Sequence, residues 1–261
     1  GASTISGTGS FSSTNNAITD SGTLAITGVT TLNSGSADIT LDQASSTFGT
    51  LAITGANVAV TENAAMDLGA STISGTGSFS STNNAITDSG TLAITGVTTL
   101  NSGSADITLD QASSTFGTLT LTGANVAVTD AGAADLGTST VSGTLGITSS
   151  GAITDSGTLA ITGDATFTNT LGSNDAITLD DTSNAFSGTV TFATDSGSAV
   201  TIVDTTALDL KALTAASLSA TSGGAITDSG TLTITGATTL NSGSADITLD
   251  QASSTFGTLT L

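Results

Sequence analysis

The chain contains no cysteine, proline, histidine, tryptophan or tyrosine, and it has a single lysine or arginine against 21 acidic residues. Without cysteine a disulfide framework is excluded, and without histidine or cysteine so is a Ser-His or Cys-His catalytic pair. The net charge of −20 predicts that the chain binds neither nucleic acid nor anionic lipid, because both contacts require Lys and Arg. No apolar run reaches the length of a membrane helix, so we also expect no membrane insertion.

What the chain has instead is small residues. Roughly a third of its residues are Ser or Thr, 32 are Gly, and the aromatic residues, 3% of the chain, are all Phe. Disordered segments combine low hydropathy with high charge. Here the mean hydropathy is +0.32, charged residues make up 8%, and β-branched residues alternate regularly. The composition therefore favours a folded chain whose thin core of Ala, Val, Ile and Leu repeats many times, rather than one deep core.

A long internal repeat is the strongest signal in the sequence. Residues 1–51 recur without change at 69–119, so that the second copy begins at Gly69 as the first begins at Gly1. Self-similarity of this kind indicates a repeat architecture. We divide the chain into repeats at 1–68, 69–136, 137–224 (diverged) and 225–261 (partial), and expect one continuous domain over 1–261. The string AITDSGTL marks the four copies, beginning at Ala17, Ala85, Ala152 and Ala225.

Within each long repeat there is a shorter one. Strand-like runs that end in an acid recur about every 23 residues from Asp20 to Asp250, and apolar residues alternate with period two, as at Leu24 and Ile26. This is strand periodicity. The spacing predicts an all-β, right-handed parallel β-helix (a β-solenoid) of about 11–12 coils of roughly 20–28 residues. A sandwich would require larger core aromatics, and a left-handed helix a strict six-residue period.

One segment has a second interpretation. Ala207–Leu218 is rich in Ala and Leu and contains Lys211, all good helix formers. Its alignment with Ala65–Ile73 of the first repeat favours strand and turn instead. We therefore predict strand here.

The recurring acids are the candidate site. If the acid-ended runs share one register, their carboxylates lie along one edge, one per coil and about 5 Å apart. Hard oxygen ligands at that spacing suit Ca²⁺, although no cofactor is required. The alternative is that each acid is a solvated turn residue that accepts a backbone N–H. The candidate metal ligands are Asp20, Asp42, Glu62, Asp88, Asp110 and Asp130.

Enzymatic activity is not expected. Some β-helices cleave polysaccharides, but a lyase requires Lys or Arg near the reacting carbon and only Lys211 exists. A hydrolase requires a carboxylate pair with one raised pKa; Asp175, Asp180 and Asp181 are close in sequence but are typical of a polar turn. The Thr array at Thr231–Thr235 could form an ice-binding face, although outward Thr also keeps any solenoid strand soluble.

Several runs resemble a known protein family. AITDSGTLAITG, ADITLDQASSTFGTLAITGANVAV and GASTISGTGSF are similar to the repeat regions of giant bacterial surface adhesins of the filamentous-haemagglutinin type. The resemblance implies a right-handed β-helix, export from a Gram-negative cell, and a role in attachment or biofilm. The Asn-Pro motifs of that family's secretion domain are missing, because the chain has no Pro.

The sequence thus predicts a structural segment of a secreted bacterial surface fibre or filament, located outside the cell. The alternative is an adhesin module that binds cells or glycans. Neither end of the chain has a polar cap, and unpaired strand edges are templates for pairing. We therefore expect self-association, end to end or laterally, and a host or neighbouring cell surface is a further candidate partner.

Overall fold

The computed structural model describes residues 1–170, 172 and 174–261. In this part of the chain there is no helix, and parallel strands stack as a β-solenoid with about 13 turns in total. The predicted parallel β-helix is confirmed. The chain divides into two compact units, Gly1–Thr129 and Asp130–Leu261. A single continuous domain across their junction remains a prediction. None of the described segments is a helix long and apolar enough to cross a membrane.

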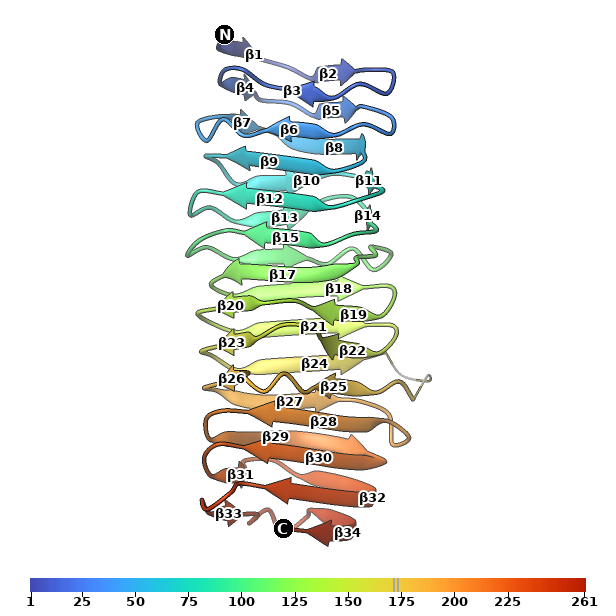
Figure 1. Cartoon of the computed structure of the whole chain (residues 1–261), viewed down its shortest axis with the longest axis vertical. Coiled ribbons are helices and arrows are strands. Elements are labelled where there is room, and N and C mark those ends of the chain that lie inside the picture. The colour runs from blue at the N-terminus through green and yellow to red at the C-terminus, as the bar shows by residue number, and fades with distance from the viewer. Residues whose placement is uncertain (171, 173) are drawn as a thin grey trace. The chain divides into compact units, whose positions relative to one another are not determined.

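The first unit consists of short strands stacked one above another, drawn in blue to green in Figure 1. All its described pairings are parallel. Its strands are β1 Ser3–Ile5, β2 Gly9–Ser12, β3 Ile18–Thr19, β4 Leu24–Ile26, β5 Thr30–Asn33, β6 Ile39–Leu41, β7 Thr47–Phe48, β8 Thr50–Gly55, β9 Val58–Glu62, β10 Met66–Leu68, β11 Ser71–Ile73, β12 Gly77–Ser81, β13 Ile86–Asp88, β14 Leu92–Ile94, β15 Thr98–Asn101, β16 Ile107–Leu109 and β17 Thr118–Gly123, with β18 Val126–Asp130 at its end.

The second unit is built in the same way and is drawn in green to red in Figure 1. Its described pairings are parallel as well. Its strands are β19 Ala134–Leu136, β20 Ser139–Val141, β21 Leu145–Ser149, β22 Ile153–Asp155, β23 Leu159–Ile161, β24 Ala165–Asn169, β25 Ile177–Leu179, β26 Ala185–Phe186, β27 Thr189–Ala193, β28 Ala199–Asp204, β29 Leu208–Ala215, β30 Ser217–Ser222, β31 Ile226–Asp228, β32 Leu232–Asn241, β33 Ile247–Thr248 and β34 Thr255–Thr260.

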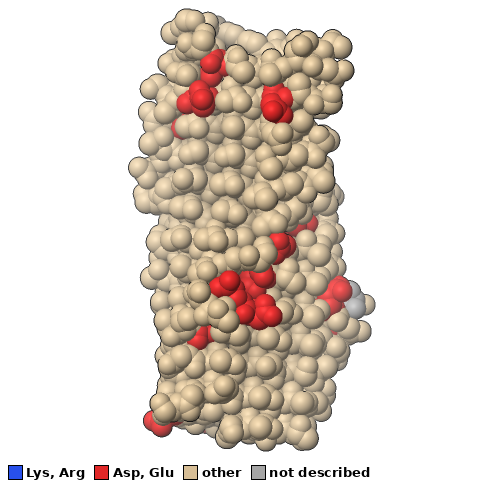
Figure 2. All heavy atoms as spheres, viewed as in Figure 1, with Lys and Arg blue, Asp and Glu red and all other residues tan. Residues whose placement is uncertain are grey.

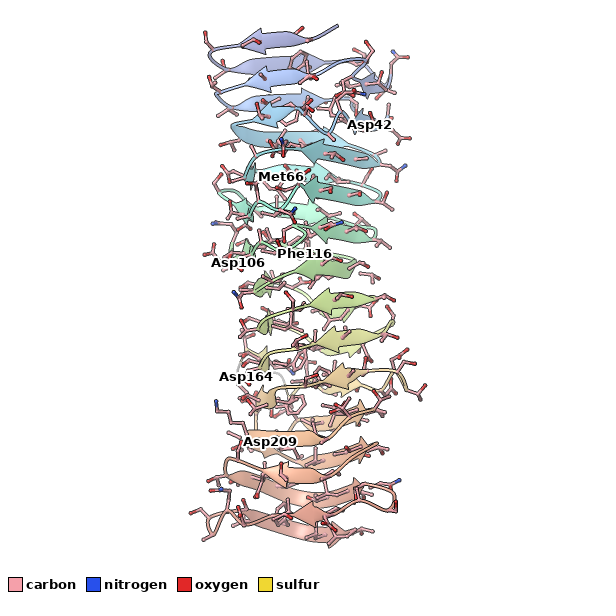
Figure 3. All side chains as sticks on the ribbon, turned by 90° about the vertical axis from the view of Figure 1, so that its left-hand side faces the viewer. Asp42, Met66, Asp106, Phe116, Asp164 and Asp209 are labelled. Carbon is pink, nitrogen blue, oxygen red and sulfur yellow. The ribbon has the colours of Figure 1, made fainter. Side chains whose placement is uncertain are left out.

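Alternation along each strand separates the core from the surface. In β17, Leu119 and Leu121 are buried while Thr118 and Thr120 are partly exposed, because successive side chains of a strand point to opposite faces. Figure 3 shows Met66 within the stack and Asp42 at its edge. In the second unit the ring of Phe167 stacks on that of Phe192 and meets that of Phe186 edge-on. The core is therefore a narrow apolar lumen filled coil by coil.

The long repeat does not contain a whole number of turns. It holds ten strands, β1–β10, and β11, which begins at Ser71, restarts the pattern that begins at Ser3 in β1. Each coil uses three strands, as the pairings of β1, β2 and β3 with β4, β5 and β6 show. Ten strands at three per coil give three and a third turns. As a result β12, the copy of β2, stacks on β9 in the column that began with β3.

This extra third of a turn explains the error in the predicted coil count. Residues that pair in neighbouring coils are 17 to 25 apart in sequence, somewhat fewer than the 20–28 predicted. The step from Glu62 to Asp88 is longer than the step from Asp42 to Glu62, because it contains more than one turn. The prediction counted one coil for each acid, although some steps between acids span more than one turn. It therefore gave 11–12 coils instead of about 13.

The ambiguous segment Ala207–Leu218 is strand, as predicted. It forms β29 and the start of β30. The pairing of β29 with β27 shifts register between Val190 and Phe192, and both Lys211 and Ala212 are exposed. Two consecutive outward residues are the mark of a β-bulge. The bulge accommodates the only cationic side chain of the sequence without placing it in the lumen.

Candidate functional site: carboxyls after the strands

The recurring acids fall into successive groups along the chain, and the first acids of these groups are Asp20, Asp88, Asp155 and Asp228. Each first acid is bonded to the backbone of the next coil. An oxygen of Asp20 accepts the N–H of Asp42 at 3.2 Å, and one of Asp88 accepts the N–H of Asp110 at 2.9 Å. In the second unit Asp155 accepts from the N–H of Asp180, and Asp228 from that of Asp250, each at 2.8 Å. These carboxylates act as turn acceptors that link coil to coil. This agrees with the backbone-acceptor part of the alternative prediction, but Asp88 and Asp228 are buried rather than solvated.

Burial shifts the pKa of two of these first acids. Burial raises the pKa of Asp88, and the N–H groups of Asp110 and Gln111 offset part of this rise because they favour the charged form. Burial also raises the pKa of Asp155, against the opposing hydrogen bond from the Asn184 amide. The turns therefore hold carboxyls in a structural environment rather than displaying them to a ligand.

The last acid of a group is buried completely. Glu62 at the end of β9 is 0% exposed and Asp204 at the end of β28 is 1% exposed. An oxygen of Glu62 accepts the N–H of Phe48 at 2.8 Å, and one of Asp204 accepts the N–H of Phe186 at 3.2 Å. Sequence reasoning placed Glu62 among surface ligands and did not single out Asp204. Each of these two acids ends a strand-like run (VAVTE, AVTIVD) that is longer than the runs before the first acids of the groups. This length was the available signal of a more buried strand.

Burial dominates the electrostatics of both groups. It raises the pKa of Glu62 from 4.5 to about 8, and the hydrogen bond from Phe48 opposes the rise without cancelling it. The pKa of Asp204 is also raised by burial, with opposing bonds from Thr206 and Phe186. The second oxygen of each carboxyl has no hydrogen-bond partner among the described residues. Both groups are therefore costly to ionise.

The six predicted metal ligands do not form one line. Glu62 stacks against Ser81 in β12, whereas Asp88 stacks against Leu68 in β10. Asp20, Asp42 and Glu62 end strands of one column, while Asp88 and Asp110 follow strands of another, because the repeat contains an extra third of a turn. Asp130 begins the second unit and is buried, with the N–H of Gly132 donating to it. The single edge of acids was a wrong prediction.

The described part of the chain contains no group of three or more acids close enough to hold a metal ion. Figure 2 shows a mostly uncharged face on which several carboxylates gather in one patch below the middle of the view and the others lie apart. Calcium bridging along the whole chain thus loses its geometric basis, and only the neighbouring pairs Asp20–Asp42 and Asp88–Asp110 keep the predicted arrangement.

A shallow groove of about 300 Å³ opens on the second unit. Its lining includes Asp164, Thr189, Asp209 and Thr227, which follow one another from coil to coil by register. The N–H of Thr189 donates to Asp164, and hydrogen bonding by Thr189, with a smaller contribution from Lys211, lowers the pKa of Asp164. An acid held ionised in this way cannot serve as the proton donor of a hydrolase.

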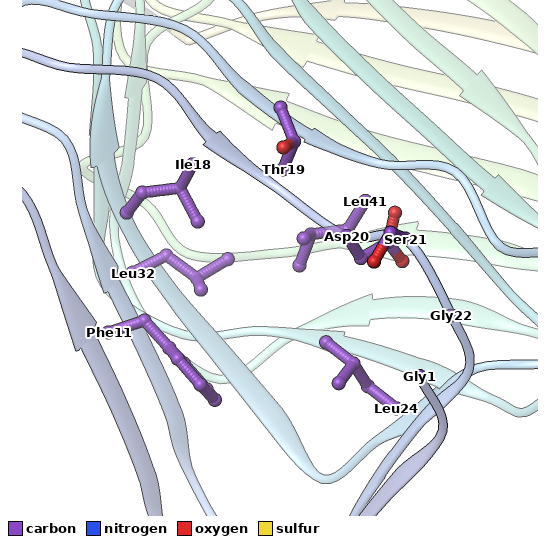
Figure 4. Close-up of a pocket in the computed structure, with 10 residues that line it drawn as sticks. All are labelled: Gly1, Phe11, Ile18, Thr19, Asp20, Ser21, Gly22, Leu24, Leu32 and Leu41. Atoms are coloured by element: carbon purple, nitrogen blue, oxygen red, sulfur yellow. The ribbon is translucent and has the colours of Figure 1, made fainter.

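A smaller cavity of about 160 Å³ lies in the lumen of the first coils. Figure 4 shows the side chains of Phe11, Ile18, Leu24 and Leu32 converging on it, with Asp20 nearby. Its lining is mainly apolar and continues the core of the unit. Nothing in this lining offers the convergent polar groups that fix a ligand's orientation.

Comparison with protein families identifies the repeats. A family described as "Repeats of unknown function (DUF5649)" matches the chain four times, at residues 1–54, 55–122, 123–193 and 197–261. The chain belongs to this family. Four successive matches agree with a protein built of repeats. The search of curated proteins found no match, and neither did the search of solved structures.

Proposed function

We propose that this member of the DUF5649 repeats is a structural segment of a secreted bacterial surface fibre or filament. The observation that supports this is that polar side chains in the turns form hydrogen bonds to neighbouring coils. Asp38 accepts from the N–H and the side-chain amide of Asn57, and Asn57 in turn accepts from the N–H of Thr76. Polar groups that would otherwise be free for recognition tie each coil to the next.

The carboxyls support the same role. Those with a raised pKa, such as Glu62 and Asp155, accept backbone N–H groups of neighbouring coils, and Glu62 is shut off from any substrate. Catalysis is therefore no part of the proposal. The exposed acids, with one cation in the whole chain, give a strongly negative surface that keeps neighbouring fibres apart at low salt.

Small-angle scattering together with electron microscopy tests the fibre role. About 13 turns at about 4.8 Å each predict a rod roughly 60 Å long per chain, and end-to-end association predicts multiples of that length. Two lobes joined by a flexible connection would contradict the proposal. The rod should resist protease along most of its length, because its described strands pair with strands of neighbouring coils.

The adhesin alternative has one feature in its favour, the groove around Asp164 and Asp209. Sugar hydroxyls are suitable donors to such carboxylates, although the chain has no Trp or Tyr to stack on a sugar ring. Glycan-array binding by the isolated chain, abolished in Asp209→Ala and retained in Asp246→Ala, would favour this alternative. The fibre role predicts no saturable glycan binding by either protein.

A further inference from the structure

At least one column of strands ends inside each unit. In the first unit β1, β4 and β7 stack in succession, and among the described residues β7 pairs with β4 alone. In the second unit β26 pairs with β23 alone. The column stops because the extra third of a turn moves the next strands to another face. The outer edges of β7 and β26 therefore lack the strand that would accept their N–H groups.

A carboxyl takes the place of the missing strand. The N–H of Phe48, at the end of β7, donates to Glu62, and the N–H of Phe186, at the end of β26, donates to Asp204. Backbone bonds flank each contact: Asn63 N–H donates to Ser46 O at 2.8 Å and Thr205 N–H to Asn184 O at 2.8 Å. The same solution occurs in both units, although their sequences have diverged.

A neutral acceptor performs the same task one coil earlier. The N–H of Leu24 donates to the hydroxyl of Ser46, and that of Leu92 to the hydroxyl of Ser114, each at 3.0 Å. Capping an edge therefore does not require an ionisable group. At Glu62 the cap can change its charge, and the group is 0% exposed with one oxygen unpartnered.

The surroundings of Glu62 provide no cation to neutralise it. On the preceding coil Leu41 pairs with Val60, so that Asp42 continues the register opposite Thr61, the neighbour of Glu62, and Asp20 lies one coil further. On the other side, β12 contributes Ser81 and no ionisable residue. After Glu62 in the chain, the acid of β10 is Asp67, which accepts bonds from Thr50 and Ser89. All nearby ionisable groups are thus acids.

The surroundings of Asp204 are similar, with the exposed Lys211 as the one cation on a neighbouring strand. On the preceding coil Leu179 pairs with Ile202, and continuing this register places Asp181, next to Asp180, opposite Asp204; Asp155 lies one coil further. On the following coil Ser222 pairs with Asp204, and β30 has no ionisable residue. The strand that follows in sequence, β29, contains Asp209 and the exposed Lys211. No ion pair to Asp204 is present among the described residues.

We propose that Glu62 and Asp204 are proton-operated clamps, which hold the edges of β7 and β26 closed while their carboxyls are neutral and open them when they ionise. The driving force is desolvation, because a buried charge with no counter-ion draws water into the junction. A hydrogen bond from Phe48 favours the charged form, but burial outweighs it and raises the pKa of Glu62 to about 8. Mildly alkaline conditions then loosen the junction at β7, and the junction at β26 opens as Asp204 ionises.

Hydrogen exchange of individual amides tests this proposal. The protection factor, which corrects for the intrinsic rise of exchange with pH, should fall for Phe48 by up to about tenfold per pH unit as the pH approaches 8. The Leu92 and Leu232 amides, capped by Ser114 and Ser254, should keep constant protection over the same range. In Glu62→Gln the amide side chain cannot ionise, so the fall at Phe48 should disappear. Asp204→Asn should do the same for Phe186.

Equal pH dependence at Phe48 and at the two leucines in the wild-type chain would overturn the clamp. So would a fall at Phe48 that persists in Glu62→Gln. The wild-type comparison stands even where a variant does not fold, because the serine-capped amides are internal controls. Asp42→Asn, which removes the nearest exposed acid, should leave the Phe48 profile unchanged, and a change there would assign the effect to surface charge.

Discussion

The side chain of Asn184 accepts a hydrogen bond from the backbone N–H of Leu159, 25 residues earlier, at 2.7 Å. Asn184 is fully buried, and Ser46 caps Leu24 in the same manner in the first repeat. A side chain at this position therefore closes a gap between coils that the backbone leaves open.

Removing this cap should be costly. We expect Asn184→Ala to lower the free energy of unfolding by about 1–3 kcal/mol, because the N–H of Leu159 is left buried without an acceptor. Asn184→Ser should restore part of the loss, as the serine caps do. Chemical denaturation checks this, with the exposed neighbour Thr182→Ala as a control expected within about 0.5 kcal/mol of wild type. A loss no larger than that of the control would show that the cap is dispensable.

The stability of the first unit should fall as the pH rises. Glu62 has a folded-state pKa of about 8 against an ordinary value of 4.5. Its contribution is therefore complete below about pH 4.5, declines by up to about 1.4 kcal/mol per pH unit above that, and is lost by about pH 8. Denaturant unfolding at several pH values should show this slope in the wild type and a flatter profile in Glu62→Gln. Parallel profiles would contradict the assignment.

Gly230 should not tolerate a side chain. A methyl group there would overlap the carbonyl oxygen of Lys211 at the bulge of β29. We expect Gly230→Ala to destabilise the chain by about 1–3 kcal/mol or more, since the obstacle is backbone that cannot rotate away. Gly7→Ala, where an added methyl meets nothing, is the matched control. Thermal unfolding of both variants, compared with the wild type, checks the difference.

Calcium should have no specific effect on folding. The six acids are divided between columns and units, and several already accept backbone N–H groups. We expect equal thermal unfolding midpoints in millimolar Ca²⁺, in chelator, and in NaCl of matched ionic strength. A midpoint raised by Ca²⁺ alone, and returned to normal in Asp88→Asn, would restore a metal site at the Asp88–Asp110 pair.

The strand content could be predicted because it depends on local pattern. Alternation at Leu24 and Ile26 is enough to indicate a strand with one buried face, and the repeat of residues 1–51 indicates that such strands stack. The composition around Lys211 is typical of a helix, but its alignment with Ala65–Ile73 of the first repeat correctly indicated strand. The number of turns was less accessible, because it depends on how many strands each coil uses.

The position of the acids could not be predicted for the same reason. Sequence equivalence placed Glu62 and Asp88 in one register, but pairing with Ser81 and Leu68 separates them. The burial of Asp204 depends on a strand from the next coil, which no local pattern specifies. An acid at the end of a strand looks the same in sequence whether it faces water or closes the edge of a sheet.

The fractional turn in each repeat has a consequence for how such a protein changes length. Because residues 1–51 and 69–119 are identical, one whole long repeat is the natural unit by which such a chain is lengthened or shortened. Within one stack, each added or removed repeat turns the strands that follow it through a third of a revolution about the stacking axis. Only gains or losses of three repeats restore the original face. Length variants of this solenoid thus fall into three rotational classes, within which any outward-facing residue keeps its direction.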